Sequence, residues 1–171
     1  ARRQLVEAGI AIEQLNAPSA SSCSSLPLLA EYGVTHAEPG HALTGTIPSN
    51  QKGDQPERIA MLWLSEISHN FRGDSYCYGG GYYRRGHAQN ALVFTPENDA
   101  PIAAKLKPVD DSSIDYYLPV AGEFPVSSAV IFCFRTQIFV TRSDVVLVSG
   151  IQRGVAEIVA RYDSLGNILE D

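Results

Sequence analysis

The sequence has few basic residues and no long apolar run, and each shortage excludes a class of protein. Its 13 Lys and Arg are outnumbered by 19 Asp and Glu, which gives a formal net charge of −6. Nucleic-acid surfaces need clustered Lys and Arg, so we expect no direct contact with nucleic acid. No apolar run reaches the roughly 18 residues that a membrane span needs. We also expect no signal peptide, because no basic segment followed by an apolar one opens the sequence.

Cysteine is also scarce. Cys23, Cys77 and Cys133 are widely spaced and form no CxxC motif. An odd number without metal-type spacing predicts reduced, packed thiols in a cytosolic protein. The chain begins at Ala1 rather than Met, which fits a fragment or a product cut from a precursor. Its 171 residues, of which 44% are hydrophobic and 19% charged, predict one globular domain with a core that needs no disulfide.

The N-terminal third is the least regular part of the sequence. Residues 1–16 carry apolar side chains at helical spacing, although the alternation of Ile10 and Ile12 also permits an extended segment. We expect an arm or helix here that leaves the domain. Residues 17–56 hold five prolines, which exclude long helices and are tolerated at sheet edges. Short edge strands are therefore predicted at 26–30 and 41–47.

Residues 56–67 are predicted to form a helix of about three turns. Pro56 suits the first helical position. Apolar side chains then recur at the spacing of one helical face, at Ile59, Leu62, Trp63 and Ile67. We expect the helix to end at His69, and residues 71–74 to turn the chain into a sheet.

The remainder of the chain has the pattern of an all-β protein. Strands are predicted at 75–83, 91–95, 102–106, 113–118, 129–141, 145–149 and 155–162, because these segments are rich in β-branched and aromatic residues and are separated by prolines. Short strands at such spacing indicate a mostly β protein with an antiparallel sandwich or barrel and one or two short helices. We assign residues 1–16 to an N-terminal arm or helix and residues 17–171 to a single domain.

Histidines are the first candidates for chemistry. His36 and His41 enclose Glu38, and His69 or His87 from a later segment would complete a cupin-like zinc or iron site. The spacing is not diagnostic of a metal, and the surrounding Pro-Gly loop favours solvated imidazoles. We therefore predict no metal and no cofactor.

Three further motifs have structural explanations that we favour. Cys23 and His36 are a candidate thiol–base pair, but no third residue orients the base. Residues 83–88 superficially resemble an acyl-CoA pyrophosphate loop, yet they precede a predicted strand rather than the helix that such a loop needs. Asp110, Asp111 and Asp115 lack the spacing of a calcium loop, which favours a solvated turn.

Arg72-Gly73-Asp74 is the tripeptide that integrins bind when it lies at an exposed loop tip. Here it follows a predicted helix and leads into a predicted strand. We expect Gly73 to supply a backbone conformation closed to other residues, and Arg72 and Asp74 to make local hydrogen bonds.

Four short motifs follow one another in a defined order along the chain. They are Arg-Gln-Leu at 3–5, the segment WLSEISHNFRGD at 63–74, Ile-Asp-Tyr-Tyr-Leu-Pro at 114–119 and Ala-Arg-Tyr-Asp-Ser-Leu-Gly at 160–166. This order resembles that of picorna-like virus capsid proteins of the dicistrovirus and marnavirus branch. In that family an Asp-Asp-Phe segment is proposed to promote cleavage of the capsid precursor, and this chain keeps Asp163 of it.

The resemblance implies that residues 17–171 form an antiparallel jelly-roll sandwich. It also implies a structural capsid protein rather than an enzyme, with no catalytic residue. Such a protein is cut from a polyprotein and assembles in the host cytoplasm into an icosahedral virion. Its partners are other capsid subunits, the genomic RNA indirectly, and a host receptor. Two alternatives stay open: a small cupin-like, metal-dependent enzyme or binding protein, and a secreted adhesion module that uses the Arg-Gly-Asp tripeptide.

Overall fold

The computed structural model describes residues 1–18, 21–45, 55–83, 90–107, 114–132 and 143–170. Contacts between residues divide the chain into two units. The first comprises Ala1–Leu64 and two short later pieces, and the second comprises Ser65–Arg85, Gln89–Val130 and Gln137–Asp171. Each unit is compact and has its own set of internal contacts. The predicted boundary between an arm at 1–16 and one domain at 17–171 stays a prediction.

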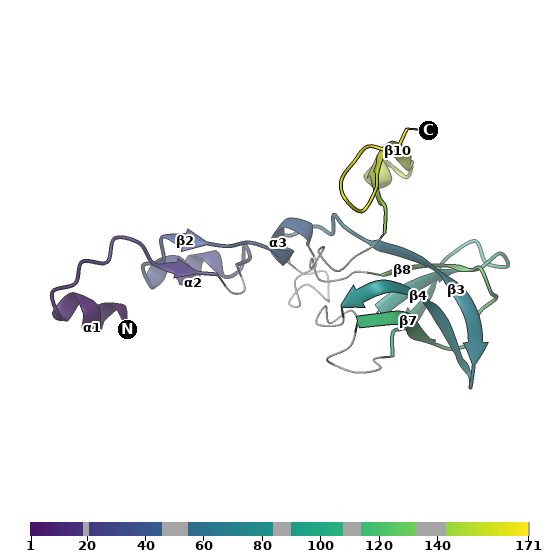
Figure 1. Ribbon diagram of the computed structural model, residues 1–171, viewed down its shortest axis with the longest axis horizontal. Coiled ribbons are helices and arrows are strands. Elements are labelled where there is room, and N and C mark those ends of the chain that lie inside the picture. Colours follow the sequence, from purple (N-terminus) through teal and green to yellow (C-terminus); the bar gives the residue numbers. More distant parts are fainter. Residues whose placement is uncertain (19–20, 46–54, 84–89, 108–113, 133–142, 171) are drawn as a thin grey trace. The chain divides into compact units, whose positions relative to one another are not determined.

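The N-terminal unit contains short elements (Figure 1). In order they are α1 (Arg2–Glu7), β1 (Asn16–Ala17), α2 (Leu26–Glu31), β2 (His36–Ala37) and α3 (His41–Thr44). β1 and β2 pair in parallel through Asn16 with His36 and Ala17 with Ala37. The Thr35 side chain supports this pair, because its hydroxyl accepts a bond of 2.9 Å from the Leu15 N–H. The helix expected within residues 1–16 is confirmed as α1.

Two predicted edge strands of this unit are wrong. Residues 26–30 lie in α2, and α3 begins at His41, where a strand over 41–47 was expected; residues 46 and 47 lie outside the described part. The prediction at α2 was wrong because proline was interpreted as a sign of a sheet edge. Pro27 lies in the first turn of the helix, where its missing N–H has no partner to lose. The Ser22 carbonyl accepts the Leu26 N–H at 3.1 Å and so begins the helical turn.

The main sheet has six strands in the order β6-β5-β8-β3-β4-β7. They are β3 (Trp63–Phe71), β4 (Asp74–Tyr83), β5 (Asn90–Phe94), β6 (Ile102–Lys105), β7 (Ile114–Ala121) and β8 (Ala129–Phe132). The pairs β3–β4, β4–β7 and β5–β6 are antiparallel. The sheet curls until its two ends meet, since Leu106 bridges Val120 and the Lys107 N–H donates to the Pro119 carbonyl at 2.8 Å (Figure 1).

The helix predicted at 56–67 is wrong, because β3 occupies Trp63–Phe71. Trp63 and Ile67 are both buried, and their even separation suits one face of a strand as well as one face of a helix. Ile59 and Leu62, which the helical reading placed on the same buried face, are exposed. The turn expected at 71–74 is confirmed, since β3 ends at Phe71 and β4 begins at Asp74.

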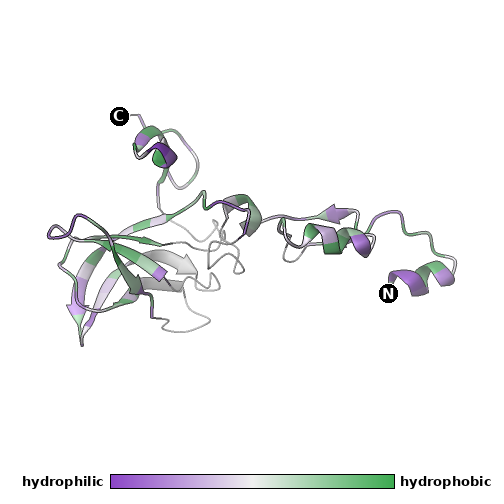
Figure 2. Cartoon of the chain, turned by 180° about the vertical axis from the view of Figure 1, so that it is seen from behind, coloured by the Kyte–Doolittle hydropathy of each residue, from purple (hydrophilic) through white to green (hydrophobic). Residues whose placement is uncertain are grey.

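The core of the second unit follows the alternation of the strands, whose hydrophobic and hydrophilic residues are coloured in Figure 2. Its fully buried apolar side chains include Ile67, Cys77, Val93, Val120 and Val130. Burial on every second residue is the pattern of a strand with one face on the core. The mostly β prediction is confirmed, and the predicted strands correspond to β4 to β10, although residues 133–141 of one lie outside the described part.

The last two strands form their own two-stranded antiparallel sheet. We call this pair, β9 (Val145–Ser149) and β10 (Glu157–Tyr162), the C-terminal hairpin. Its connection contains a short 3-10 helix, η4 (Ile151–Arg153), between Gly150 and Gly154. Beyond β10, Tyr162 bridges Ile168, so the chain folds back along the strand. Among the described residues no helix is both long and apolar enough to cross a membrane.

Candidate functional site

The Arg72-Gly73 turn joins β3 to β4, and its backbone conformation explains why a glycine stands at the centre of the Arg-Gly-Asp tripeptide. Both central residues have positive φ, 53° at Arg72 and 82° at Gly73, between the paired residues Phe71 and Asp74. Positive φ at both positions is the signature of a type I′ hairpin turn. The Arg72 guanidinium lies 5.0 Å from the centre of the Phe71 ring. The expected conformational role of Gly73 is therefore confirmed.

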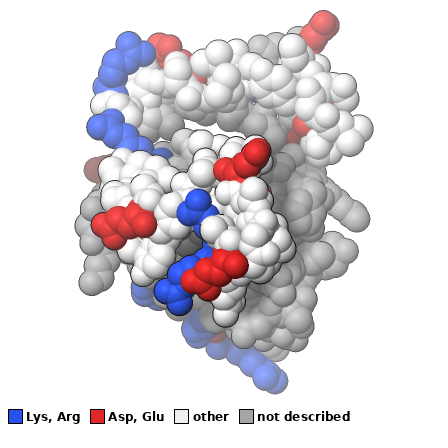
Figure 3. Space-filling model, turned by 90° about the vertical axis from the view of Figure 1, so that its left-hand side faces the viewer, with Lys and Arg blue, Asp and Glu red and all other residues white. Residues whose placement is uncertain are grey.

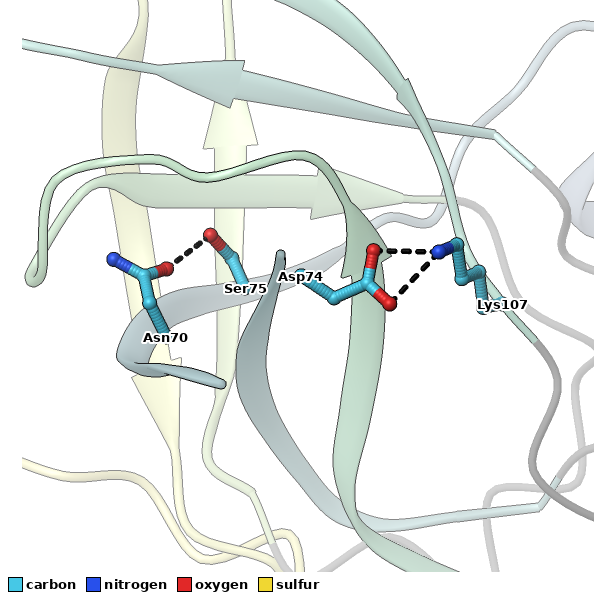
Figure 4. Close-up of polar contacts among 4 residues, drawn as sticks. All are labelled: Asn70, Asp74, Ser75 and Lys107. Carbon is cyan, nitrogen blue, oxygen red and sulfur yellow. Dashed lines mark hydrogen bonds and ion pairs between the residues drawn. The ribbon is translucent and has the colours of Figure 1, made fainter. Parts of the chain in front are cut away.

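Behind the turn, a polar cluster centred on the buried Ser75 ties the β3–β4 hairpin to the loop after β7; Figure 4 shows its contact between Asn70 and Ser75. The Ser75 hydroxyl is fully buried, donates to the Asn70 carbonyl oxygen Oδ1 and accepts from the Phe124 N–H at 2.8 Å. The Asn70 amide Nδ2 donates to the Phe124 carbonyl at 2.9 Å. The Ser75 N–H donates to the Gly122 carbonyl at 2.8 Å. Each of these polar groups is thus bonded within the protein.

Asp74 and Lys107 form an ion pair beside this cluster (Figure 4). The Lys107 ammonium lies 2.6 Å from Oδ1 and 2.7 Å from Oδ2 of Asp74. The hydrogen bond from Lys107, its positive charge and a backbone bond from Gly122 hold the pKa of Asp74 below its ordinary value. The local hydrogen bonds expected of Arg72 and Asp74 stay a prediction, because the partner of Asp74 is Lys107, 33 positions away along the chain. An integrin ligand needs a free carboxylate at a loop tip, and this one is engaged by a lysine.

The polar cluster resembles a reactive site in residue types but not in access. A nucleophilic serine needs a base within hydrogen-bond reach and a surface that substrate can approach. Ser75 has no exposed area, and its hydroxyl is shared by an amide oxygen and a backbone N–H. We conclude that Asn70 and Ser75 hold the turn in place. Sequence reasoning missed both, although a serine at an inward strand position, two residues before buried Cys77, signals a partnered polar group.

Four ring side chains gather on the solvent side of β3, β4 and β7, and we call them the aromatic surface. The His69 ring stacks on the Tyr76 ring, with 4.9 Å between the ring centres and an interplanar angle of 5°. It also lies edge-on to the Tyr117 ring, with 5.4 Å between the ring centres. The ring centres of Tyr78 and Tyr117 lie 5.6 Å apart. Each such ring pair contributes about 0.5–1.5 kcal/mol beyond the area that it buries. The aromatic surface therefore braces three neighbouring strands.

A β-bulge places His69 on this surface. Ile67 pairs with Cys77, but the next pair is His69 with Tyr76, so β3 carries one extra residue at this point. The extra residue is Ser68, whose hydroxyl donates to the Tyr76 carbonyl at 2.9 Å. Without the bulge His69 would continue the inward alternation of Ile67. Bulges re-aim side chains in this way. No pattern in the sequence predicts the bulge at Ser68.

The candidate metal residues do not form a site in the described part of the chain. There, no group of three His, Cys, Asp or Glu side chains is close enough to hold a metal ion. Glu38 accepts a hydrogen bond from the Asn16 amide, and the His36 ring bonds the Thr35 hydroxyl at 2.8 Å. His69 belongs to the aromatic surface. His87, Asp110 and Asp111 lie outside the described residues, as do the side chains of His41 and Asp115.

The two described cysteines are free thiols; Cys77 is buried as expected, whereas Cys23 is exposed, so the packing expected for Cys23 is wrong. Burial raises the pKa of Cys77 to about 11. Glu57 raises the pKa of Cys23 by a hydrogen bond and by its negative charge, and its carboxylate also accepts the Cys23 N–H at 2.5 Å. Since the thiolate is the nucleophile, these environments oppose the thiol–base pair considered for Cys23 and His36. Cys133 lies outside the described residues.

Asp163 organises a turn. Its Oδ1 accepts the N–H groups of Leu165 and Asn167 at 2.9 and 2.8 Å, and Oδ2 accepts the Asn167 amide at 2.8 Å. The hydrogen bonds from Asn167 lower the pKa of this carboxyl. A carboxylate that bonds its own backbone in this way is a turn device, and a role in precursor cleavage is not supported.

Charged side chains are dispersed on the face shown in Figure 3, where blue and red groups alternate between white areas. Among the described residues, ion pairs include Lys107 with Asp74 and Arg3 with Glu7. Binding to phosphates requires Lys and Arg that gather on one surface. The pictured face offers no such surface in the part of the chain that is described.

Comparison with known proteins gives two findings. Residues 62–158, more than half of the chain, match the family model described as "YhfX-like, C-terminal domain". The chain is also 83% identical over 169 residues to the uncharacterized protein YhfX of Escherichia coli (strain K12). That match covers 99% of this chain and 44% of the relative, so the chain spans less than half of the relative's length.

These findings overturn the viral interpretation. A bacterial relative at this identity contradicts a capsid protein of a picorna-like virus, together with its polyprotein origin, its virion location and its partners: capsid subunits, genomic RNA and a host receptor. The four motifs that carried the resemblance are short and degenerate, and the helix predicted at 56–67 overlaps the motif at 63–74, where β3 lies instead. Neither finding supports the cupin-like alternative. The chain belongs to the YhfX-like C-terminal domain family.

Proposed function

We propose that this chain is a non-catalytic β domain of a longer protein, and that its function is to pack against the remainder of that protein. The family description names a C-terminal domain, and the E. coli relative has more than half of its length outside the match. The chemistry supports a non-catalytic role. Ser75, Cys77 and Asp74 have the residue types of reactive groups, and each is buried or bonded within the described structure.

The observation that carries the proposal is the amount of large apolar surface left exposed. Monomeric proteins expose single apolar side chains routinely, but they rarely expose contiguous apolar patches. Exposed large apolar residues recur through both units; in the N-terminal unit they include Leu5, Val6, Ile10, Leu26, Leu28 and Tyr32. A longer polypeptide that covers such residues gains free energy by removing them from water.

The finer form of the fold is part of the proposal. The meeting of β6 with β7 through Leu106 and Val120 supports a small, six-stranded closed sheet. A jelly roll instead places eight strands in two facing sheets. The jelly-roll arrangement expected from the sequence stays a prediction. A closed sheet has no free edge for another chain to extend, so packing on this domain would use side chains rather than strand addition.

The packing proposal is tested by thermal unfolding of two proteins, this chain alone and the full-length E. coli relative. We expect the six-stranded sheet of β3 to β8, called here the β3–β8 sheet, to unfold at a lower temperature in the chain alone. The reason is that only the longer protein covers the apolar surface of this sheet. Peptide-resolved alkylation at Cys77 reports the unfolding of the sheet, since this thiol is buried until then. Equal midpoints in the two proteins, with the sheet melting independently of the remainder, would overturn the proposal.

A further inference from the structure

The C-terminal hairpin is extended by one short segment, since Tyr162 bridges Ile168 and the Leu169 N–H donates to the Arg161 carbonyl at 2.9 Å. It forms a two-stranded sheet of its own, and an isolated two-stranded hairpin is marginally stable at best in water. Three or more strands, or packing of a hydrophobic face, are needed for independent stability. The hairpin must therefore be stabilised by something that its own two strands do not provide.

Each face of the hairpin carries apolar side chains together with one charged residue, Glu157 opposite Ser149 on one face and Arg161 opposite Val146 on the other. Val145 lies opposite Tyr162 and Leu147 opposite Ala160 on one face, while Val148 lies opposite Ile158 on the other. A strand with one solvated face alternates apolar and polar residues. β9 instead runs Val-Val-Leu-Val, which is typical of a strand covered on both sides. The sequence is thus that of a buried element.

The exposure of these side chains contradicts that pattern. Val146 is 46% exposed, Leu147 50%, Ile158 57% and Val159 59%. Val159 is the extra residue of a bulge, because Ile158 pairs with Val148 and Ala160 with Leu147. A bulge increases the local twist of a strand, and part of the outer edge of β10 is already occupied by Ile168 and Leu169. The missing cover is then a packed apolar surface.

We propose that the C-terminal hairpin docks into the part of the longer YhfX-type protein that lies outside this chain. This inference rests on the proposed function and names the contact through which it acts. The length available supports that occupant, since the match covers 44% of the E. coli relative and leaves more than half of it to supply the surface. The contact is apolar, because exposed valine, leucine and isoleucine dominate both faces of the hairpin.

Hydrogen exchange of residues 145–162 tests the docking in this chain alone and in the full-length E. coli relative. We expect the hairpin amides to exchange at least about tenfold more slowly in the full-length protein, because docking suppresses local opening. Equal exchange in the two proteins would overturn the docking. If the β3–β8 sheet is nevertheless stabilised in the longer protein, the proposed function survives and only the hairpin contact is lost. Protection in the isolated chain that grows with its concentration would assign the surface to a second copy and would also overturn it.

A substitution pair separates docking from folding. Val146→Thr with Val148→Thr, placed at the aligned positions of the full-length relative, keeps size and β-branching and so keeps the strand. We expect it to restore fast exchange in the hairpin while β3 and β4 stay protected. Val126→Thr is the matched control, since Val126 is exposed outside the hairpin, and it should leave the exchange of the hairpin unchanged. Protection that persists in the double variant overturns the docking.

Discussion

The curled sheet and the C-terminal hairpin are built from the same residue types, yet they differ in how those residues are used. In the sheet, Val93, Val120 and Val130 are fully buried and alternate with exposed neighbours such as Leu92 and Phe94. In the hairpin, Val145, Val146 and Leu147 follow one another and all are exposed. Alternation lets a sheet cover its own apolar face. An unbroken apolar run has no solvated face, so it depends on another surface.

The largest expected difference between these regions is the response to isoleucine truncation. Ile67→Ala in β3 removes a fully buried side chain and should lower the free energy of unfolding by about 2–5 kcal/mol. Ile158→Ala in β10 removes an exposed one and should change it by less than about 0.5 kcal/mol in the chain alone. Urea denaturation followed by circular dichroism measures both. A large loss from Ile158→Ala would mean that the hairpin already packs within this chain.

This contrast also marks what the sequence could predict. The strands from 74 onward were predictable because each is rich in β-branched and aromatic residues, which is a local signal, and because turn residues separate them. The position of β3 was not, since Trp63 and Ile67 fit one face of either a helix or a strand, and only burial against other strands decides between them. Pro27 was misread for a similar reason, because proline suits both a sheet edge and a first helical turn.

The candidate site was less predictable than the fold. The polar cluster joins Asn70 and Ser75 to Phe124, about fifty positions away, and such contacts have no local pattern. The aromatic surface depends on the bulge at Ser68, which the sequence does not reveal. The Arg72-Gly73 turn was predictable because glycine beside a strand boundary indicates a turn by itself. Resemblance among short motifs failed, since their order carries little structural information.

The second expected effect is the loss of a buried hydroxyl. Ser75→Ala leaves the Phe124 N–H and the Asn70 carbonyl oxygen without their partner. We expect a loss of about 1–3 kcal/mol in the free energy of unfolding, because the substitution removes two hydrogen bonds that contribute about 0.5–1.5 kcal/mol each. The control Ser164→Ala, at an exposed position after β10, should stay within about 0.5 kcal/mol. Equal stability of Ser75→Ala and the parent in urea denaturation would remove the cluster as a structural tie.

The third effect is confined to the hairpin. Gly150 has a φ of 80°, and a Cβ placed there would lie 2.3 Å from the Val155 carbonyl oxygen. Gly150→Ala should therefore destabilise the connection between β9 and β10 by about 1–3 kcal/mol. Hydrogen exchange should show faster opening of residues 145–162 and unchanged protection of β4. Faster exchange throughout β3 and β4 as well would show that the two regions unfold as one.

The smallest effect is a difference in pH dependence between two aspartates. Lys107 holds the pKa of Asp74 below the ordinary 3.8, and Asn167 lowers that of Asp163 from the same value. A lowered carboxyl pKa stabilises the folded state above the unfolded pKa, and this contribution is lost as pH falls through the folded value. The urea midpoint of the sheet should therefore fall when the pH drops below about 4, and less steeply in Asp74→Asn.

Asp163→Asn should leave that slope unchanged and alter only the hairpin, if the turn at Asp163 opens independently of the sheet. Raising the salt concentration should weaken the Asp74 effect, because its lysine partner is half exposed. An identical slope in all three proteins would mean that the Asp74–Lys107 pair does not contribute to stability in solution.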